Sequence, residues 1–245
     1  MCIKFGDPIN FVVPTGNFGN ILAGEYARRM GLPIGKLLCA SNANHVLADF
    51  LETGCYDANR AFHQTISPSM DILLSSNLER YLFELAERDV AKVRDWMEQL
   101  RTMRSYTISA RQLSQMRARL YGGWTDDMQT RQTICNTWDH FHYLADPHTA
   151  VAFSLLARYR AETGDHTPAV VVSTAHPYKF GRDVGEALLR TRLDDFAACE
   201  ALSHYTGIPI PQAIASLPDL PIRHTAVCAP SEMDDALRQI FSTNG

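Results

Sequence analysis

A loop rich in glycine and asparagine, Gly16-Asn17-Phe18-Gly19-Asn20, follows a short apolar run that ends at Pro14. Glycine lets the main chain approach a ligand closely, and backbone N–H groups at the start of a helix attract anions. The loop can therefore cradle a phosphate group. It can equally be a plain strand-to-helix turn in which Asn17 and Asn20 cap the helix, and the local pattern favours neither interpretation over the other.

Polar side chains also follow a valine-rich run, in the sequence Val170-Val-Val-Ser173-Thr174-Ala-His176. A serine or threonine hydroxyl can donate a hydrogen bond to a ligand heteroatom while remaining neutral. Taken alone, the pattern favours a structural role, in which Thr174 caps the next helix and His176 packs beneath it.

The segment Asp146-Pro147-His148-Thr149 has the pattern of a helix start. Aspartate is a preferred N-cap residue, and proline is favoured at the first helical position. We therefore prefer a cap at Asp146 over a metal-binding or acid–base role for His148.

The remaining elements follow from the periodicity of the apolar residues. Strands are predicted over residues 9–13, 36–41 and 169–173, with a further candidate at 224–228. Helices are predicted over residues 21–30, 43–52, 78–87, 90–101, 109–120, 126–142 and 149–161, and from Ser231. Residues 121–124 are expected to break the helical pattern, and 169–173 to form a central strand. Strands that alternate with helices predict an α/β fold, a helix-rich three-layer domain around a short, mostly parallel sheet with ligands at its carboxyl edge.

Composition limits the classes of partner. The chain has 245 residues, of which 46% are hydrophobic and 20% charged, and its formal net charge is −4. No basic run stands apart from the acids, so neither nucleic acid nor an anionic membrane is expected as a partner. The six cysteines form no CxxC pair, and no apolar run is long enough to span a bilayer. We expect a cytoplasmic protein with reduced cysteines and no metal.

Five blocks carry a resemblance to a known family. In chain order they are TGNFGN, ASNANHVL, TISPSMDILLSSNLERYLFEL, ADPHTAVA and STAHPYKF. Together they resemble the C-terminal half of threonine synthase, a pyridoxal-phosphate enzyme of the tryptophan-synthase-β fold type (fold type II), from about Ile9 onwards. The resemblance implies a lyase of threonine biosynthesis that converts O-phospho-L-homoserine and water to L-threonine and phosphate. Pyridoxal phosphate (PLP) would supply the electron sink.

The resemblance also implies roles for particular residues. The glycine loop would hold the cofactor phosphate, through Gly16, Asn17, Phe18, Gly19 and Asn20. Thr174, with Ser173 as the alternate, would face the pyridine nitrogen of the cofactor. Three further residues lie in blocks that would line the substrate pocket, without a defined catalytic role: Ser69, Asp71 and His148.

The lysines of the chain do not match this family pattern. They are Lys4, Lys36, Lys92 and Lys179, whereas the family's Schiff-base lysine precedes the glycine loop by a long stretch. The resemblance therefore implies that residues 1–245 are the C-terminal PLP-binding portion of a threonine-synthase-like enzyme, with the N-terminal lysine-bearing portion absent.

Such a truncated chain is expected to be inactive alone and to bind PLP weakly or not at all. Its expected partners are a small phosphorylated amino acid and either its own missing half or a second copy. The alternative is a non-catalytic module of the same fold that binds a phosphate ligand or dimerises.

Overall fold

The computed structural model describes residues 4–223 and 225–242. The chain divides into two compact units, a large one up to Ile210 and a small one from Pro211. The small unit contains α10 (Gln212–Ala215), α11 (Met233–Ser242) and the 3-10 turns η3 (Leu217–Asp219) and η4 (Pro230–Glu232). The strand proposed at 224–228 is absent from Thr225–Cys228, while His224 lies outside the described residues.

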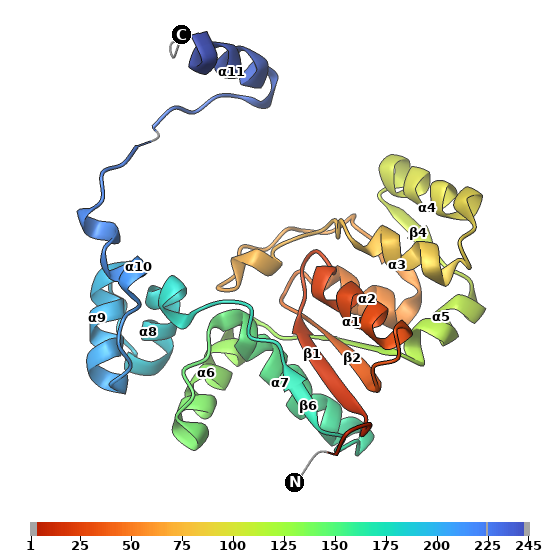
Figure 1. Ribbon diagram of the computed structural model, residues 1–245, viewed down its shortest axis with the longest axis horizontal. Coiled ribbons are helices and arrows are strands. Elements are labelled where there is room, and N and C mark those ends of the chain that lie inside the picture. The colour runs from red at the N-terminus through yellow and green to blue at the C-terminus, as the bar shows by residue number, and fades with distance from the viewer. Residues whose placement is uncertain (1–3, 224, 243–245) are drawn as a thin grey trace. The chain divides into compact units, whose positions relative to one another are not determined.

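A four-stranded parallel sheet forms the centre of the large unit (Figure 1). Its strands, in spatial order, are β5 (Leu120–Trp124), β2 (Ile34–Ser41), β1 (Ile9–Pro14) and β6 (Ala169–Val171). A separate antiparallel pair joins β3 (Cys55–Asp57) to β4 (Ser105–Thr107). The prediction of a short, mostly parallel sheet is confirmed.

Helices cover both faces of this sheet, as three layers require. Helices α1 (Gly19–Arg29) and α2 (Val46–Thr53) pack on one face, and α7 (Pro147–Thr163) packs on the other. Successive strand residues alternate between the two cores: Val13 belongs to the α1–α2 side, and its neighbour Val12 packs with Leu155 of α7. Both faces of β1 and β2 are therefore buried, which explains their continuous apolar sequences.

The other helices of the large unit surround this centre. They are α3 (Leu78–Leu85), α4 (Val90–Met103), α5 (Ala110–Arg117), α6 (Asp127–Phe141), α8 (Gly181–Leu189), α9 (Asp195–Thr206) and the 3-10 turns η1 (Pro68–Met70) and η2 (Pro177–Phe180). The predicted cap at Asp146 is confirmed, because its carboxylate accepts hydrogen bonds from the N–H groups of His148 and Thr149, with Pro147 in the first turn.

Residues 121–124 break the helical pattern as predicted, but they also form a strand that was not predicted, and the central position expected for 169–173 is wrong. Residues 121–124 lie in β5, which pairs in parallel with β2. Glycine is tolerated in this strand because the helices on either side leave no room for a Cβ. The strand predicted over 169–173 covers only Ala169–Val171, and it lies at the edge of the described sheet, since β6 pairs only with β1 and Val170 is 44% exposed.

In the described part of the chain, no helix is long and apolar enough to cross a membrane, and no cluster of three potential metal ligands occurs. The described cysteines are all free: Cys39, Cys55, Cys135, Cys199 and Cys228.

Candidate functional site

The candidate site lies at the carboxyl edge of the parallel sheet. The glycine loop follows β1, the segment Ser173-Thr174 follows β6, and Asn42 follows β2. Strand pairing brings these ends together, because Val12 of β1 is paired with Val171 of β6 and Pro14 with Ala40 of β2. Polar segments that are far apart in the sequence therefore meet at one edge, where α/β proteins bind their ligands.

The glycine loop is not capped by its asparagines. The N-cap residue of α1 is Phe18, in the left-handed conformation with φ 61°, and no side chain caps the helix. The phenyl ring is 1% exposed and lies 5.6 Å from the ring of Tyr81, between centroids. The interpretation in which Asn17 and Asn20 cap the helix is wrong. The aromatic side chain instead fixes the loop to the core.

The carbonyl groups and the N–H groups of this loop differ in their surroundings. The Gly16 carbonyl accepts a hydrogen bond from Ser75 Oγ at 2.9 Å, and the Asn17 carbonyl accepts one from Asn77 Nδ2 at 2.8 Å. None of the backbone N–H groups from Gly16 to Asn20 donates to an acceptor within the described residues. The first turn of α1 also contains no acidic residue. The loop thus presents unpaired donors at the positive end of a helix dipole.

The two glycines of the loop have different neighbours. A Cβ on Gly16 would lie 2.8 Å from the backbone oxygen of Ser69, so packing against the η1 turn requires glycine there. A Cβ on Gly19 would meet nothing closer than Asn77 Nδ2, at 3.5 Å. Gly19 is therefore exposed, and a side chain there would make only an ordinary van der Waals contact with Asn77.

Asp71, in the TISPSMD block, forms hydrogen bonds with the segment that follows β2. Its Oδ1 accepts hydrogen bonds from Asn42 Nδ2 at 2.7 Å, Asn44 Nδ2 at 2.9 Å and Thr65 Oγ1 at 2.7 Å. Its Oδ2 accepts one from the Thr65 N–H at 2.9 Å. Asp71 is half-buried and fully engaged with protein donors, so it shapes the edge of the site.

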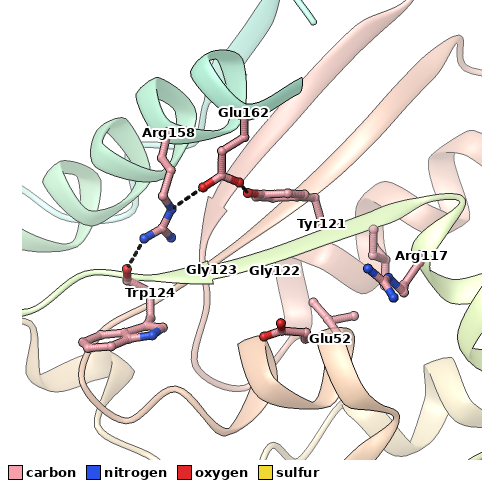
Figure 2. Close-up of a pocket in the computed structure, with 10 residues that line it drawn as sticks. Glu52, Arg117, Tyr121, Gly122, Gly123, Trp124, Arg158 and Glu162 are labelled. Carbon is pink, nitrogen blue, oxygen red and sulfur yellow. Dashed lines mark hydrogen bonds and ion pairs between the residues drawn. The ribbon is translucent and has the colours of Figure 1, made fainter. Parts of the chain in front are cut away.

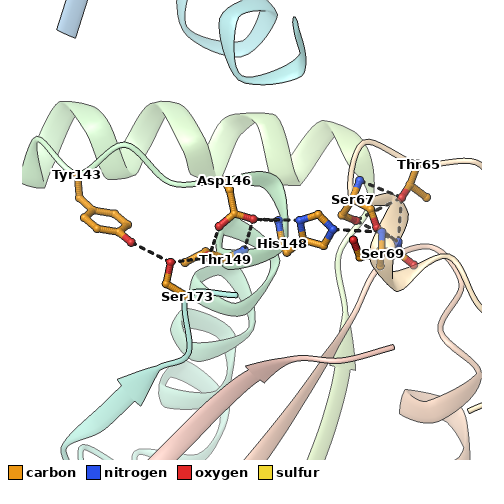
Figure 3. Close-up of polar contacts among 9 residues, drawn as sticks. Thr65, Ser67, Ser69, Tyr143, Asp146, His148, Thr149 and Ser173 are labelled. Atoms are coloured by element: carbon orange, nitrogen blue, oxygen red, sulfur yellow. Dashed lines mark hydrogen bonds and ion pairs between the residues drawn. The ribbon is translucent and has the colours of Figure 1, made fainter. Parts of the chain in front are cut away.

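His148 connects the start of α7 to the η1 turn, as Figure 3 shows. The side chains of His148 and Asp146 are 2% and 1% exposed. His148 Nδ1 lies 3.0 Å from Asp146 Oδ1, and Nε2 lies 3.2 Å from the backbone nitrogen of Ser69. Ser69 is itself exposed, so His148 lies behind the η1 turn that carries Ser69.

Ser173 and Thr174 are both exposed at the end of β6. Ser173 Oγ lies 3.3 Å from Tyr143 Oη and 3.4 Å from Thr149 Oγ1. The Thr174 side chain makes no hydrogen bond with the part of the chain that the structure describes. The prediction that Thr174 caps the next helix is wrong, because exposed His176 occupies that position and its Nδ1 accepts from the Tyr178 N–H at 3.3 Å.

The lysines lie in ordinary surroundings. Lys36 Nζ donates to the carbonyls of Arg117 and Ala118, and burial lowers the pKa of Lys36. However, Lys36 stands near the amino end of β2, away from the carboxyl edge. Lys92 lies over the Trp96 ring on α4, and Lys179 lies over the Phe180 ring in η2.

A pocket of about 410 Å³ borders the edge strand β5, and it differs from the candidate site (Figure 2). Arg158 Nη1 donates to the Trp124 carbonyl at 3.0 Å, and the Tyr121 hydroxyl donates to Glu162. Burial, together with this carboxylate, raises the pKa of Tyr121 to about 12. Arg158, Tyr121 and Glu162 are therefore paired with protein groups, whereas the glycine loop keeps unpaired donors.

A parallel sheet that is covered by helices on both faces and has polar loops at its carboxyl edge defines an α/β protein. A family model described as "Threonine synthase, C-terminal" matches residues 149–233. The human protein Threonine synthase-like 1 is 38% identical over 210 residues, which is 84% of this chain and 28% of that protein.

Solved structures agree with this match. PLP-bound threonine synthase from Brucella melitensis is 41% identical with a TM-score of 0.71, covering 80% of this chain and 41% of that one. Threonine synthase from yeast is 33% identical with a TM-score of 0.75, covering 87% of this chain and 43% of that one. The chain matches the C-terminal part of the threonine synthase family, and it spans between 28% and 43% of the length of these relatives.

Sequence reasoning missed several residues that shape this edge. Asn42 and Asn44 bind Asp71, and Thr149 links Asp146 to Ser173. These residues lie in the blocks ASNANHVL and ADPHTAVA, so the sequence marked the segments. It did not indicate which of their side chains contact one another in the fold.

Proposed function

We propose that this chain forms the part of a PLP-dependent threonine-synthase-like enzyme that holds the cofactor phosphate and faces the cofactor ring. The observation that carries the proposal is the set of unpaired backbone N–H groups from Gly16 to Asn20 at the start of α1. A phosphate monoester needs several such donors and access to them, and the exposed position of Gly19 leaves the neighbouring amides accessible.

The residues present fit PLP in their chemistry. The loop amides would bind the phosphate, and the hydroxyl of Thr174, or of Ser173, would meet the pyridine nitrogen. A neutral hydroxyl does not hold a proton on that nitrogen as a carboxylate would. When bound, PLP supplies an electron sink for carbanion chemistry. In the whole enzyme, the substrate would be O-phospho-L-homoserine, and the products L-threonine and phosphate.

The covalent anchor of the cofactor would come from outside these residues. Lys36 is held at the amino end of β2, Lys92 lies on α4, and Lys4 precedes β1. Lys179 is in η2, closest in sequence to the candidate site, but it follows the glycine loop, whereas the resemblance implies an anchoring lysine that precedes this loop. The chain alone would therefore bind PLP weakly and would not turn over substrate. We also propose a cytoplasmic location.

The test is a titration of the purified chain with PLP and, in parallel, with inorganic phosphate. Gly19→Asp places a carboxylate beside the loop amides and is expected to abolish binding of both ligands, because like charges repel. Gly19→Asn is the control of similar size without the charge and should lose less affinity. Equal binding by wild type and Gly19→Asp would overturn the assignment of the loop.

A second measurement tests the absence of turnover. The chain is incubated with PLP and O-phospho-L-homoserine, and released phosphate is measured. Borohydride reduction followed by mass spectrometry then detects PLP bound covalently to a lysine. We expect no phosphate release and no specific adduct. Turnover together with an adduct on one lysine would show that the chain carries its own anchor.

One observation favours a second function, a module that binds a phosphate ligand or dimerises. The edge strand β6 leaves Val170 44% exposed, and valine runs of this kind are typical of strands buried on both faces. Analytical ultracentrifugation of wild type and Val170→Lys separates the two functions. A dimer that Val170→Lys dissociates without changing phosphate affinity would support the dimerisation module.

A further inference from the structure

Asp146 uses its two carboxylate oxygens in different directions (Figure 3). Oδ1 accepts from the His148 N–H at 2.9 Å and lies 3.0 Å from His148 Nδ1, and Oδ2 accepts from the hydroxyl of Thr149. A helix cap needs only the contacts with backbone N–H groups. The contacts with the two side chains are additional, and each leads to a different end of the candidate site.

The first branch leads to the glycine loop. The Ser69 N–H can only donate, so His148 Nε2 must accept, and the ring proton is therefore on Nδ1, facing Asp146. This arrangement fixes both the tautomer and the ring orientation. The backbone oxygen of Ser69 in turn lies 2.8 Å from the position of a Cβ on Gly16. Asp146 thus reaches the glycine loop through His148 and the η1 turn.

The second branch leads to the end of β6. Thr149 has one hydroxyl proton, and a carboxylate only accepts, so this proton points to Asp146. Thr149 Oγ1 also lies 3.4 Å from Ser173 Oγ, which is the acceptor in this contact and accepts a hydrogen bond from Tyr143 at 3.3 Å. Ser173 is the acceptor in both contacts, so its position at the end of β6 depends on Thr149 and Tyr143.

We propose that Asp146 is a positioning residue that holds the two ends of the cofactor site in register. One oxygen fixes Gly16 at the phosphate end through His148 and Ser69, and the other fixes Ser173 at the ring end through Thr149. This inference rests on the proposed function for its consequence in ligand binding. The mechanical link between Asp146 and the two ends can be tested without any ligand.

The ligand-free test measures backbone amide resonances of the full chain by NMR. Asp146→Asn keeps a good N-cap residue, so the helix start is preserved. We expect it to displace the amide signals of both Ser69 and Gly16 and of Ser173. His148→Leu should displace only the first pair, and Thr149→Val, which keeps the shape of the side chain, only the signal of Ser173. Shifts confined to the first turn of α7 in all three variants would overturn the proposal.

The ligand test compares PLP with inorganic phosphate. His148→Leu is expected to lower the affinity for both ligands by about tenfold, which is the cost of losing one charge-assisted contact. His148→Gln retains an acceptor for the Ser69 N–H and should recover part of this loss. Thr149→Val should lower the affinity for PLP and leave the affinity for phosphate unchanged, because Thr149 contacts Ser173 at the ring end of the site. A general loss of packing would instead affect both ligands equally in both variants, and that result would contradict the proposal.

Failure of the proposed function and failure of the positioning role of Asp146 give different results. If the wild-type chain binds neither ligand, the proposed function fails, and the amide shifts alone decide whether Asp146 links the two ends. If the wild type binds both ligands and Asp146→Asn changes neither affinity, the proposed function stands and the positioning role is refuted.

Discussion

Gly123 in β5 and Gly19 at the start of α1 have opposite surroundings. A Cβ on Gly123 would lie 2.2 Å from Arg158 Nη2 and 2.4 Å from Leu155 Cδ1, whereas the nearest atom at Gly19 is 3.5 Å away. The packing of the protein requires glycine at position 123. Nothing in the described residues requires it at position 19. The comparison separates a glycine that serves the fold from one whose free space we assign to a ligand.

Replacing Gly123 with alanine should produce the largest loss of stability among the variants discussed here. Leu155 is fully buried, so any shift of its side chain must be accommodated within the core. We expect the free energy of unfolding to fall by about 1–3 kcal/mol, the usual cost of overpacking a core. Urea denaturation measures the change, with Gly19→Ala as the matched control. A loss no larger than that of the control would mean that Arg158 and Leu155 move aside. The packing would then not require glycine at position 123.

Gly16 is the intermediate case, because it belongs to the candidate site and is also packed. Its added Cβ would meet the backbone oxygen of Ser69 at 2.8 Å, and a backbone atom moves less easily than a side-chain end. Gly16→Ala should lower the free energy of unfolding by about 1–2 kcal/mol and also weaken PLP binding. Ser69→Ala is the control, since it leaves the backbone oxygen in place. If both variants behave alike, the contact between η1 and Gly16 is not responsible.

The sequence could predict the elements whose signal is local. The cap at Asp146 and the strand Ile9–Pro14 depend on neighbouring residues, and both were found where the pattern placed them. Residues 121–124 were missed because their two glycines resemble a turn, and only the pairing with β2 and the bulk of Arg158 make them a strand. The edge position of β6 was likewise invisible, because a valine run does not state how many partners it has.

The candidate site shows the same limit. The position of the glycine loop after β1 followed from the chain order, but its unpaired N–H groups depend on Phe18 taking the N-cap position in the left-handed conformation. The contact of His148 with Ser69 joins residues that are 79 positions apart. Contacts of this kind come from the crossing of parallel strands, and no local pattern encodes them.

The amino edge of the sheet differs from the carboxyl edge, because its polar side chains form hydrogen bonds with one another. Asp165 Oδ2 accepts from Tyr159 Oη at 2.6 Å and from Asn10 Nδ2 at 3.0 Å. Hydrogen bonds from Thr167 first, and then from Tyr159, lower the pKa of Asp165. The folded state therefore favours the carboxylate.

Asp165→Asn should cost about 1 kcal/mol of unfolding free energy at neutral pH. A lowered folded pKa gives stability that is present above the unfolded value near pH 4 and is lost as the pH falls through the folded pKa. Urea denaturation of both proteins across this range should show the difference shrinking in acid. A difference that stays constant with pH would assign the effect to packing. Asp219→Asn, on an exposed turn of the small unit, is the control for the change of charge.

Gly19→Ala should have the smallest effect on stability and is the most decisive for the ligand. Alanine forms helices better than glycine, so the free energy of unfolding should stay constant or rise by up to about 1 kcal/mol. The matched control is Gly24→Ala in the same helix, where the added Cβ would lie 2.7 Å from Leu37 Cδ2. We expect Gly19→Ala to reduce affinity for PLP and phosphate without loss of stability, and Gly24→Ala to lose stability with the loop amides intact. Unchanged affinity in Gly19→Ala would mean that the phosphate does not bind beside Gly19.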